Sequence, residues 1–280
     1  MSEYSLLQII RHGDDGTIAE LALDRPDALN AISTEFAQQI TAATAELSAD
    51  PSVAVVVLTS TAARAFCVGA DLKERNSFTD EQMLQQRTIT TGAYGGVLNL
   101  PVPAIAAVEG FALGGGFELA LSCDLIVASD TAVVGLPEVS VGVIPGGGGT
   151  QLLSRRVGSA KAARAIFTAG RYDAASALLH GFVDEVAPAG DAREQALGLA
   201  AAIAKNSPVG LRNAKAALRQ GYDLPLAQGL EIEGQGWQRT VLSADRAEGI
   251  TAFVEKRPPR WPGLKPAGTY DDEHDSGTAG

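Results

Sequence analysis

The sequence predicts an α/β fold that is followed by a helical region. Short apolar runs rich in β-branched residues alternate with helix-like segments through the first two thirds of the chain, a pattern typical of parallel βαβ units. After about residue 186, apolar residues recur at helical spacing with no strand between them. We therefore expect a core over residues 1–186, a helical region over 187–261, and an acidic tail over 262–280 whose composition indicates disorder.

Five apolar runs predict the strands of the core. The first two flank a Gly-Asp-Asp-Gly turn, and the other three are continuous, as expected of strands that are buried on both faces. The predicted strands are 6–10, 18–23, 53–58, 104–108 and 125–128.

Helical spacing predicts the remaining elements. Ser33 is expected to cap a helix that runs to about Leu47, because Phe36, Ile40 and Ala43 recur on one of its faces. A short helical segment is predicted at 119–122. The helical region is predicted to consist of helices at 192–205, 208–219 and 226–241.

Composition and charge restrict the classes of function. The 280 residues carry a net charge of −11, which argues against nucleic-acid binding, since that usually needs a basic face. Only Cys67 and Cys123 occur, without a metal-ligand or redox spacing, so we expect two buried thiols and no metal. The N-terminus lacks a signal-peptide pattern and no apolar run reaches about 18 residues. The chain is therefore expected to be cytoplasmic, with no membrane span.

Several common catalytic motifs are absent from the sequence. It contains no G-x-G-x-x-G, no Gly-Lys pair of a phosphate-binding loop and no G-x-S-x-G elbow. His12, His180 and His274 are far apart and are expected on the surface. Dinucleotide binding, metal catalysis and a nucleophilic triad therefore lack obvious residues.

The first feature that suggests chemistry is the run Gly114-Gly115-Gly116, which follows a predicted strand and precedes a helix. Helix starts offer unpaired N–H groups that can stabilise an oxygen as it becomes negative. The alternative is a tight turn that simply needs positive φ angles. A glutamate in the first helical turn, Glu118, favours the first interpretation.

A second turn, Gly69-Ala70-Asp71, follows another predicted strand and its loop. Asp71 can cap a short helix from Leu72, which would leave the N–H of Ala70 pointing out of the turn. Two N–H donors from separate turns are what a thioester carbonyl needs as it becomes an enolate.

Two carboxylates lie beside such turns. Glu118 and Glu138 are separated by 20 residues and one predicted strand, so they can return to one edge of a parallel sheet. The alternative is that each is a solvated surface glutamate. A further glycine run, Pro145 to Gln151, either binds an anion or lets the segment that carries Glu138 pack closely.

These segments together resemble the enoyl-CoA hydratases of the crotonase superfamily. The resemblance extends from about Leu6 to Gly263 and rests on the order of five segments: 25–31 (RPDALNA), 65–74 (AFCVGADLKE), 103–124 (PAIAAVEGFALGGGFELALSCD), 137–151 (PEVSVGVIPGGGGTQ) and 249–257 (GITAFVEKR). Within the superfamily, the most similar pattern is the methylglutaconyl-CoA hydratase type, on 70–75 (ADLKER), 99–103 (NLPVP) and 256–259 (KRPP).

The resemblance implies a spiral core of ββα units, a helical oligomerisation region and the following roles. Ala70 and Gly115 supply the oxyanion-hole N–H groups, Glu118 activates the water, and Glu138 delivers a proton to Cα. The product of hydration is a 3-hydroxyacyl-CoA, as in fatty-acid β-oxidation. The implied residues for binding the substrate and its CoA are Arg25, Ala28, Ala31, Ala70, Asp71, Leu72, Lys73, Gly114, Phe253 and Lys256.

The resemblance also implies partners. The substrate is an acyl-CoA, no cofactor is needed beyond the coenzyme A that the substrate carries, and the chain is a homo-oligomer, as a trimer or a dimer of trimers. The segment 77–99, with Met83, Ile89, Tyr94 and Val97, is expected to line the acyl pocket.

Two alternatives stay open. A Δ3-Δ2-enoyl-CoA isomerase would use the same fold with Glu138 alone as proton carrier. A non-catalytic or RNA-binding relative is the other, and the acidic balance argues against it.

Overall fold

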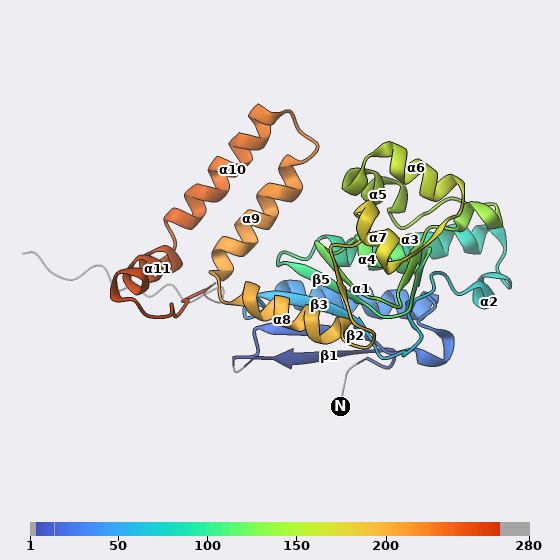
Figure 1. Ribbon diagram of the computed structural model, residues 1–280, viewed down its shortest axis with the longest axis horizontal. Coiled ribbons are helices and arrows are strands. Elements are labelled where there is room, and N and C mark those ends of the chain that lie inside the picture. The colour runs from blue at the N-terminus through green and yellow to red at the C-terminus, as the bar shows by residue number, and fades with distance from the viewer. Residues whose placement is uncertain (1–3, 14, 264–280) are drawn as a thin grey trace, which may run out of the picture. The chain divides into compact units, whose positions relative to one another are not determined.

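The computed structural model describes residues 4–13 and 15–263, and its contacts divide the chain into two compact units (Figure 1). Unit 1 ends at Asn206 and unit 2 begins at Ser207. The sequence places this boundary near residue 186, but helix α8 (Ala192–Ala204) packs against the strands of unit 1. From residue 264 onward, the predicted tail lies outside the described residues.

Unit 1 contains a sheet of six strands in the order β1-β2-β3-β5-β7-β10. All neighbouring strands are parallel except β1 and β2, which form an antiparallel pair. The five predicted strands are confirmed within two residues at each end. The strands are Leu7–His12 (β1), Ile18–Leu23 (β2), Val55–Ser60 (β3), Ala104–Val108 (β5), Leu125–Ser129 (β7) and Glu185–Ala187 (β10).

A second sheet has four short strands in the order β4-β6-β8-β9. They are Ala65–Cys67 (β4), Phe111–Leu113 (β6), Val133–Gly135 (β8) and Arg171–Asp173 (β9). Three pairs of consecutive strands each place their first strand in the large sheet and their second strand in the small sheet: β3–β4, β5–β6 and β7–β8. Helical structure follows each pair. The repeating unit is therefore ββα, as the resemblance implied, and not the βαβ unit that the apolar runs alone predicted.

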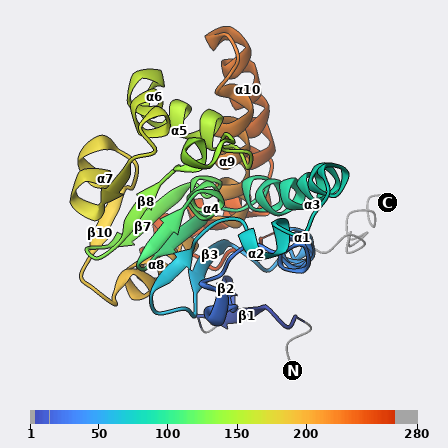
Figure 2. The ribbon, with the colours of Figure 1, turned by 90° about the vertical axis from the view of Figure 1, so that its right-hand side faces the viewer.

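The two faces of the six-stranded sheet bury different clusters. One face packs against an alanine stripe of α8, which consists of Ala192, Ala196 and Ala200. The other face packs against α1 (Thr34–Ala49) and α4 (Gly115–Leu121). Figure 2 shows α1 beside α3 (Asp80–Leu98), and the two helices are in contact. Alternation of side chains along the parallel strands thus buries both faces.

The predicted helix starts are confirmed where side chains cap them. Ser33 accepts a hydrogen bond from the backbone N–H of Phe36, and Asp71 accepts from Lys73 and Glu74 at the start of α2 (Leu72–Arg75). The remaining helical elements of unit 1 are Pro26–Ala28 (η1), Glu138–Val141 (η2), Gly149–Val157 (α5), Ser159–Phe167 (α6) and Ala174–His180 (α7).

Unit 2 contains α9 (Pro208–Gly221), α10 (Leu226–Val241) and α11 (Ala244–Glu255). The first two helices pack against each other and match the predicted segments, whereas α11 had no prediction of its own. Large apolar side chains of unit 2 are exposed, including Trp237, Leu242 and Phe253. Within the described residues, no helix is long and apolar enough to cross a membrane.

Candidate active site

A cavity of about 480 Å³ in unit 1 brings together the two turns and both glutamates that the sequence singled out. Its walls come from the start of α2, the inner side of α3, the β6–α4 turn, η2 and the glycine-rich loop before α5. The residues predicted for chemistry that line it are Ala70, Gly115, Glu118 and Glu138. Both glutamates are therefore more than solvated surface residues.

The two glycine turns are in direct contact. A Cβ atom on Gly69 would lie 2.9 Å from the carbonyl oxygen of Leu113 and 3.0 Å from the backbone nitrogen of Gly115. Ile32 fixes the first turn, since its N–H donates to Gly69 O (2.7 Å) and its carbonyl accepts from Asp71 N–H (3.1 Å). This arrangement leaves the N–H groups of Ala70 and Gly115 without a hydrogen-bond acceptor among the described residues.

The sequence of the second turn follows from its backbone and its packing. Gly114 has φ 54° and ψ −127°, a conformation that residues with a side chain avoid. A Cβ on Gly116 would lie 1.9 Å from the carbonyl oxygen of Cys67 in β4. Glycine at 114 and 116 meets both requirements, so α4 can begin at Gly115 with Glu118 in its first turn.

Glu118 is buried, with 2% of its surface exposed, and is held by the glycine-rich loop. Its Oε1 atom accepts hydrogen bonds from the backbone N–H groups of Gly147 and Gly149, each at 2.7 Å. Burial raises the pKa of Glu118, and these two N–H groups oppose that rise by favouring the carboxylate. The loop from Pro145 to Gln151 thus donates two hydrogen bonds to the carboxyl group of Glu118.

Glu138 begins the short helix η2 on the other side of the cavity. Both of its carboxyl oxygens are buried without a hydrogen-bond partner among the described residues. Oε1 lies only 3.0 Å from the position of a Cβ on Gly114, so the carboxyl group sits against the oxyanion turn. Burial raises the pKa of Glu138 to about 7, and the charge of Glu118 adds to the rise.

The two carboxyl groups therefore have different surroundings. Backbone donors favour the ionised form of Glu118, whereas nothing described donates a hydrogen bond to the side chain of Glu138. Carboxyl groups whose environments separate their protonation states are suited to act as base and acid in one reaction.

Arg87 is a site residue that sequence reasoning missed. It comes from α3, lines the cavity and donates a hydrogen bond from Nη1 to the carbonyl oxygen of Gly146 (3.1 Å). Its charge also lowers the pKa of Glu118, against the effect of burial. In the sequence it is a lone arginine in a helical segment, and nothing there indicates that it contacts Gly146, which is 59 residues further along the chain.

The residues of unit 1 that are implied for CoA binding lie in three groups. Ala70, Leu72 and Gly114 line the cavity. Arg25 donates to Asp71 Oδ2 and to Ala31 O, each at 2.7 Å, so these side chains fix the start of α2. Ala28, Ala31 and Lys73 belong to the same segments but do not line the cavity. Their CoA contacts stay predictions.

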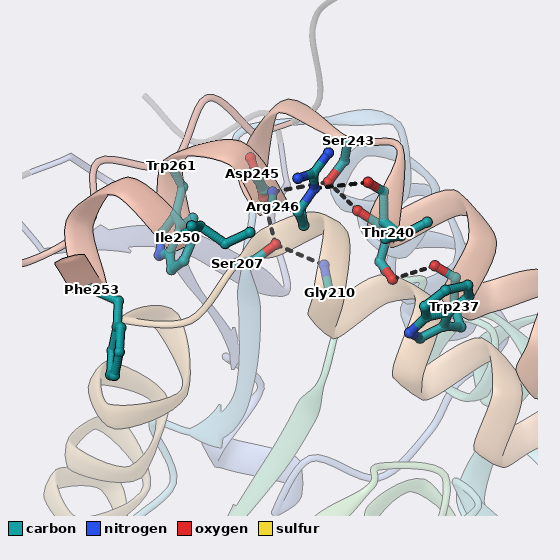
Figure 3. Close-up of a pocket in the computed structure, with 12 residues that line it drawn as sticks. Ser207, Gly210, Trp237, Thr240, Ser243, Asp245, Arg246, Ile250, Phe253 and Trp261 are labelled. Carbon is teal, nitrogen blue, oxygen red and sulfur yellow. Dashed lines mark hydrogen bonds between the residues drawn. The ribbon is translucent and has the colours of Figure 1, made fainter.

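Phe253 and Lys256 lie in unit 2, at the end of α11. Phe253 lines a separate cavity of about 530 Å³ within that unit, together with Trp237, Ile250 and Trp261 (Figure 3). The buried carboxylate there, Asp245, accepts hydrogen bonds from Ser207 Oγ and from the N–H of Gly263. Among the described residues, Asp245 is the one carboxylate that lines this cavity, and the roles of Phe253 and Lys256 stay predictions.

The segment 77–99 lines the acyl side of the cavity only in part. Met83 and Tyr94 line it as expected. Ile89 and Val97 instead pack against the hydrophobic core. The prediction for these two is wrong because α3 turns one face to α1 and only the other face to the cavity.

The histidines within the described residues lie away from the cavity. His12 contacts Glu20 and His180 packs edge-on against Tyr172. No group of three metal-ligating side chains occurs among the residues that the structure describes.

Comparisons with known proteins identify the family and the fold of the chain. A family model described as enoyl-CoA hydratase/isomerase matches residues 13–264. The Mus musculus protein named "enoyl-CoA hydratase domain-containing protein 2, mitochondrial" is 39% identical over 255 residues, which are 90% of this chain and 86% of that protein.

Solved structures share the fold. The crystal structure of an enoyl-CoA hydratase from Bacillus anthracis has a TM-score of 0.89 at 35% identity and covers 92% of this chain and 99% of its own. An enoyl-CoA hydratase from Mycobacterium smegmatis has a TM-score of 0.85 at 29% identity, with coverages of 92% and 99%. The chain therefore belongs to the enoyl-CoA hydratase/isomerase family, within the crotonase superfamily.

Proposed function

We propose that this enzyme adds water across the 2,3 double bond of a 2-enoyl-CoA thioester to give a 3-hydroxyacyl-CoA. The observation that carries the proposal is the presence of two carboxyl groups with opposite surroundings in one cavity. Glu118 is held by two backbone N–H groups, while the oxygens of Glu138 have no partner among the described residues. Hydration needs one group to take a proton and another to give one.

The proposed mechanism starts at the oxyanion turns. The thioester oxygen accepts hydrogen bonds from the N–H groups of Ala70 and Gly115, which polarises the double bond so that Cβ becomes electrophilic. Glu118 takes a proton from the attacking water, and Glu138 gives its proton to Cα. The proposed reaction uses no cofactor beyond the coenzyme A of the substrate.

The direct test is hydration of crotonyl-CoA, which is monitored through the loss of the conjugated double bond. We expect Glu118→Gln and Glu138→Gln each to lower kcat by roughly 10²–10⁴-fold, the usual contribution of a general acid or base. Glu109→Gln, on a glutamate of unit 1 that caps α8 outside the cavity, is the matched control and should keep wild-type kcat. Wild-type rates in both cavity variants would refute the assignment.

Isomerisation of 3-enoyl-CoA is the alternative reaction on this fold. It would need Glu138 as proton carrier and would not need Glu118 to activate water. A wild-type enzyme that converts 3-enoyl-CoA far faster than it hydrates crotonyl-CoA, with Glu118→Gln unimpaired, would favour the isomerase.

One observation favours a substrate of the methylglutaconyl-CoA type as the second candidate. Arg75, Arg87 and Arg171 all line the cavity, and none of them forms an ion pair within the part of the chain that the structure describes. A carboxylate at the far end of the acyl group would supply the missing negative charge. We therefore expect a substrate panel to include turnover of 3-methylglutaconyl-CoA.

The variant that tests this candidate is Arg171→Gln, with Arg164→Gln on exposed α6 as control. If the acyl carboxylate binds here, Arg171→Gln raises KM for 3-methylglutaconyl-CoA about tenfold and leaves KM for crotonyl-CoA unchanged. Equal changes for both substrates would exclude a contact to the acyl carboxylate.

We further propose a cytoplasmic homo-oligomer, a trimer or a dimer of trimers, that acts in fatty-acid β-oxidation. The exposed apolar side chains of unit 2 support the oligomer. The pathway rests on the family alone, and the compartment rests on the sequence alone.

A further inference from the structure

Tyr94 is a polar side chain of the cavity that the proposed mechanism does not use. It lies on α3, lines the cavity and has 9% of its surface exposed. Its hydroxyl group forms no hydrogen bond with a described residue, and it is not among the buried atoms that lack a partner, so it is open to the cavity. A hydroxyl group that faces a substrate cavity without a protein partner can donate a hydrogen bond to a molecule that binds there.

The position of the ring is fixed by two glycines. A Cβ on Gly115 would lie 2.3 Å from the Tyr94 hydroxyl oxygen, and a Cβ on Gly147 would lie 2.6–2.7 Å from ring atoms. Gly115 belongs to the oxyanion turn, and the N–H of Gly147 holds Glu118. Tyr94 therefore lies between the place of the thioester and the carboxylate that is proposed to activate water.

Glu118 leaves one oxygen for that water. Both backbone donors bind Oε1, and Oε2 has no hydrogen bond to a described residue. Tyr94 is near enough for the charge of Glu118 to raise its pKa, after the larger effect of burial, so the phenol keeps its proton. The two side chains do not hydrogen-bond to each other, and both line the same cavity.

We propose that the Tyr94 hydroxyl donates a hydrogen bond to the water that adds to Cβ, while Glu118 Oε2 accepts a proton from the same water. One lone pair of the water oxygen then accepts from Tyr94, and the other attacks Cβ. In the reverse reaction, Tyr94 donates to the hydroxyl group as it leaves. Tyr94 is thus a further catalytic residue, and this inference rests on the proposed hydration.

The test is Tyr94→Phe, which keeps the ring between the two glycines and removes only the hydroxyl group. We expect kcat for hydration of crotonyl-CoA to fall about 10- to 100-fold, with KM within about twofold and an unchanged melting temperature. Tyr172→Phe is the matched control, because Tyr172 lies in β9 outside the cavity, and it should keep wild-type kcat.

A second variant separates the hydroxyl from the ring. Tyr94→Leu removes the ring as well, so it should raise KM and lower the melting temperature in addition to lowering kcat. If Tyr94→Phe has wild-type kcat and only Tyr94→Leu is impaired, the role of Tyr94 is packing and this inference is overturned while the hydratase assignment stands. If the wild-type enzyme hydrates no 2-enoyl-CoA, both proposals fail.

Discussion

At the scale of single residues, the surroundings of Glu138 determine what it can do. Neither of its oxygens is hydrogen-bonded to a described residue, and its carboxyl group lies against Gly114. An ionised carboxylate in such a position lacks the donors that would stabilise its charge. The protonated form is the one that fits this place, as a donor of the proton to Cα requires.

The pH dependence of hydration follows from this environment. Because burial raises the pKa of Glu138 to about 7, the acid form is present below that pH and is lost above it. We expect kcat/KM for hydration to fall about tenfold per pH unit well above pH 7, and to fall also at low pH, where Glu118, whose pKa is raised by burial, takes up a proton and can no longer act as the base. The rate of crotonyl-CoA hydration between pH 5 and 9 measures this.

The control for this profile is Glu138→Gln. Its residual activity should lack the fall above pH 7, because the titrating group is gone. A wild-type profile that stays level to pH 9, or a variant that keeps the descending limb, would assign the proton donor to another group.

The sequence indicated Glu118 and Glu138 correctly as residues of one cavity, but it did not reveal how Glu118 is held. The donors to Glu118 are backbone N–H groups of residues 29 and 31 positions later in the chain. A backbone N–H group is the same in every residue except proline, so the sequence does not show which residues donate to Glu118. The run of glycines at 146–149 indicated that this loop packs closely against another segment, but not that the segment is the one with Glu118. Arg87 was missed for a similar reason, since its partner is the carbonyl oxygen of Gly146.

At the scale of elements, five of the six strands of the large sheet were predictable, whereas the three-residue strand β10 and the strands of the small sheet were not. Strands such as β5 are continuous apolar runs of five or six residues, whereas β4, β6, β8 and β9 have three residues each. Three residues are too few for a period to be recognised. The helix α8 was predicted, but its alanine face gave no sign that it covers the sheet of unit 1.

Because α4 packs closely against β4, we expect a methyl group added at Gly116 to destabilise the protein. In Gly116→Ala the new Cβ would lie 1.9 Å from the carbonyl oxygen of Cys67, which is backbone and cannot turn away. We expect a loss of about 3 kcal/mol or more in the free energy of unfolding, measured by urea denaturation, together with loss of hydration.

Gly198→Ala is the matched control for this substitution. Gly198 is an exposed residue inside α8, and nothing lies within 4 Å of the position of its Cβ. Alanine there should stabilise the protein by about 0.5–1 kcal/mol, because alanine has a higher helix propensity than glycine and its methyl group displaces no neighbouring atom. Equal stabilities of the two variants would mean that α4 and β4 are not held as closely as described.

At the scale of the whole molecule, unit 2 has an apolar surface that its own three helices do not bury. Trp237 is 65% exposed, Leu242 77% and Phe253 85%. Single exposed apolar residues are ordinary, but several on consecutive helices indicate a surface that is covered by another protein. A second copy of this chain is the partner that the family relationship favours.

We therefore expect the wild-type protein to have the mass of a trimer or a hexamer in light scattering at micromolar concentration. Trp237→Glu should shift the mass toward the monomer, because it places a charge in the apolar surface. Gln238→Glu is the matched control: it adds the same charge on the neighbouring exposed position of α10 without removing an apolar side chain, and it should leave the mass unchanged.

If Phe253 and Lys256 reach the active site of a neighbouring copy, Trp237→Glu should also raise KM for crotonyl-CoA although its position lies outside the unit 1 cavity. A monomeric wild-type protein with full activity would refute both the oligomer and the role of these two residues.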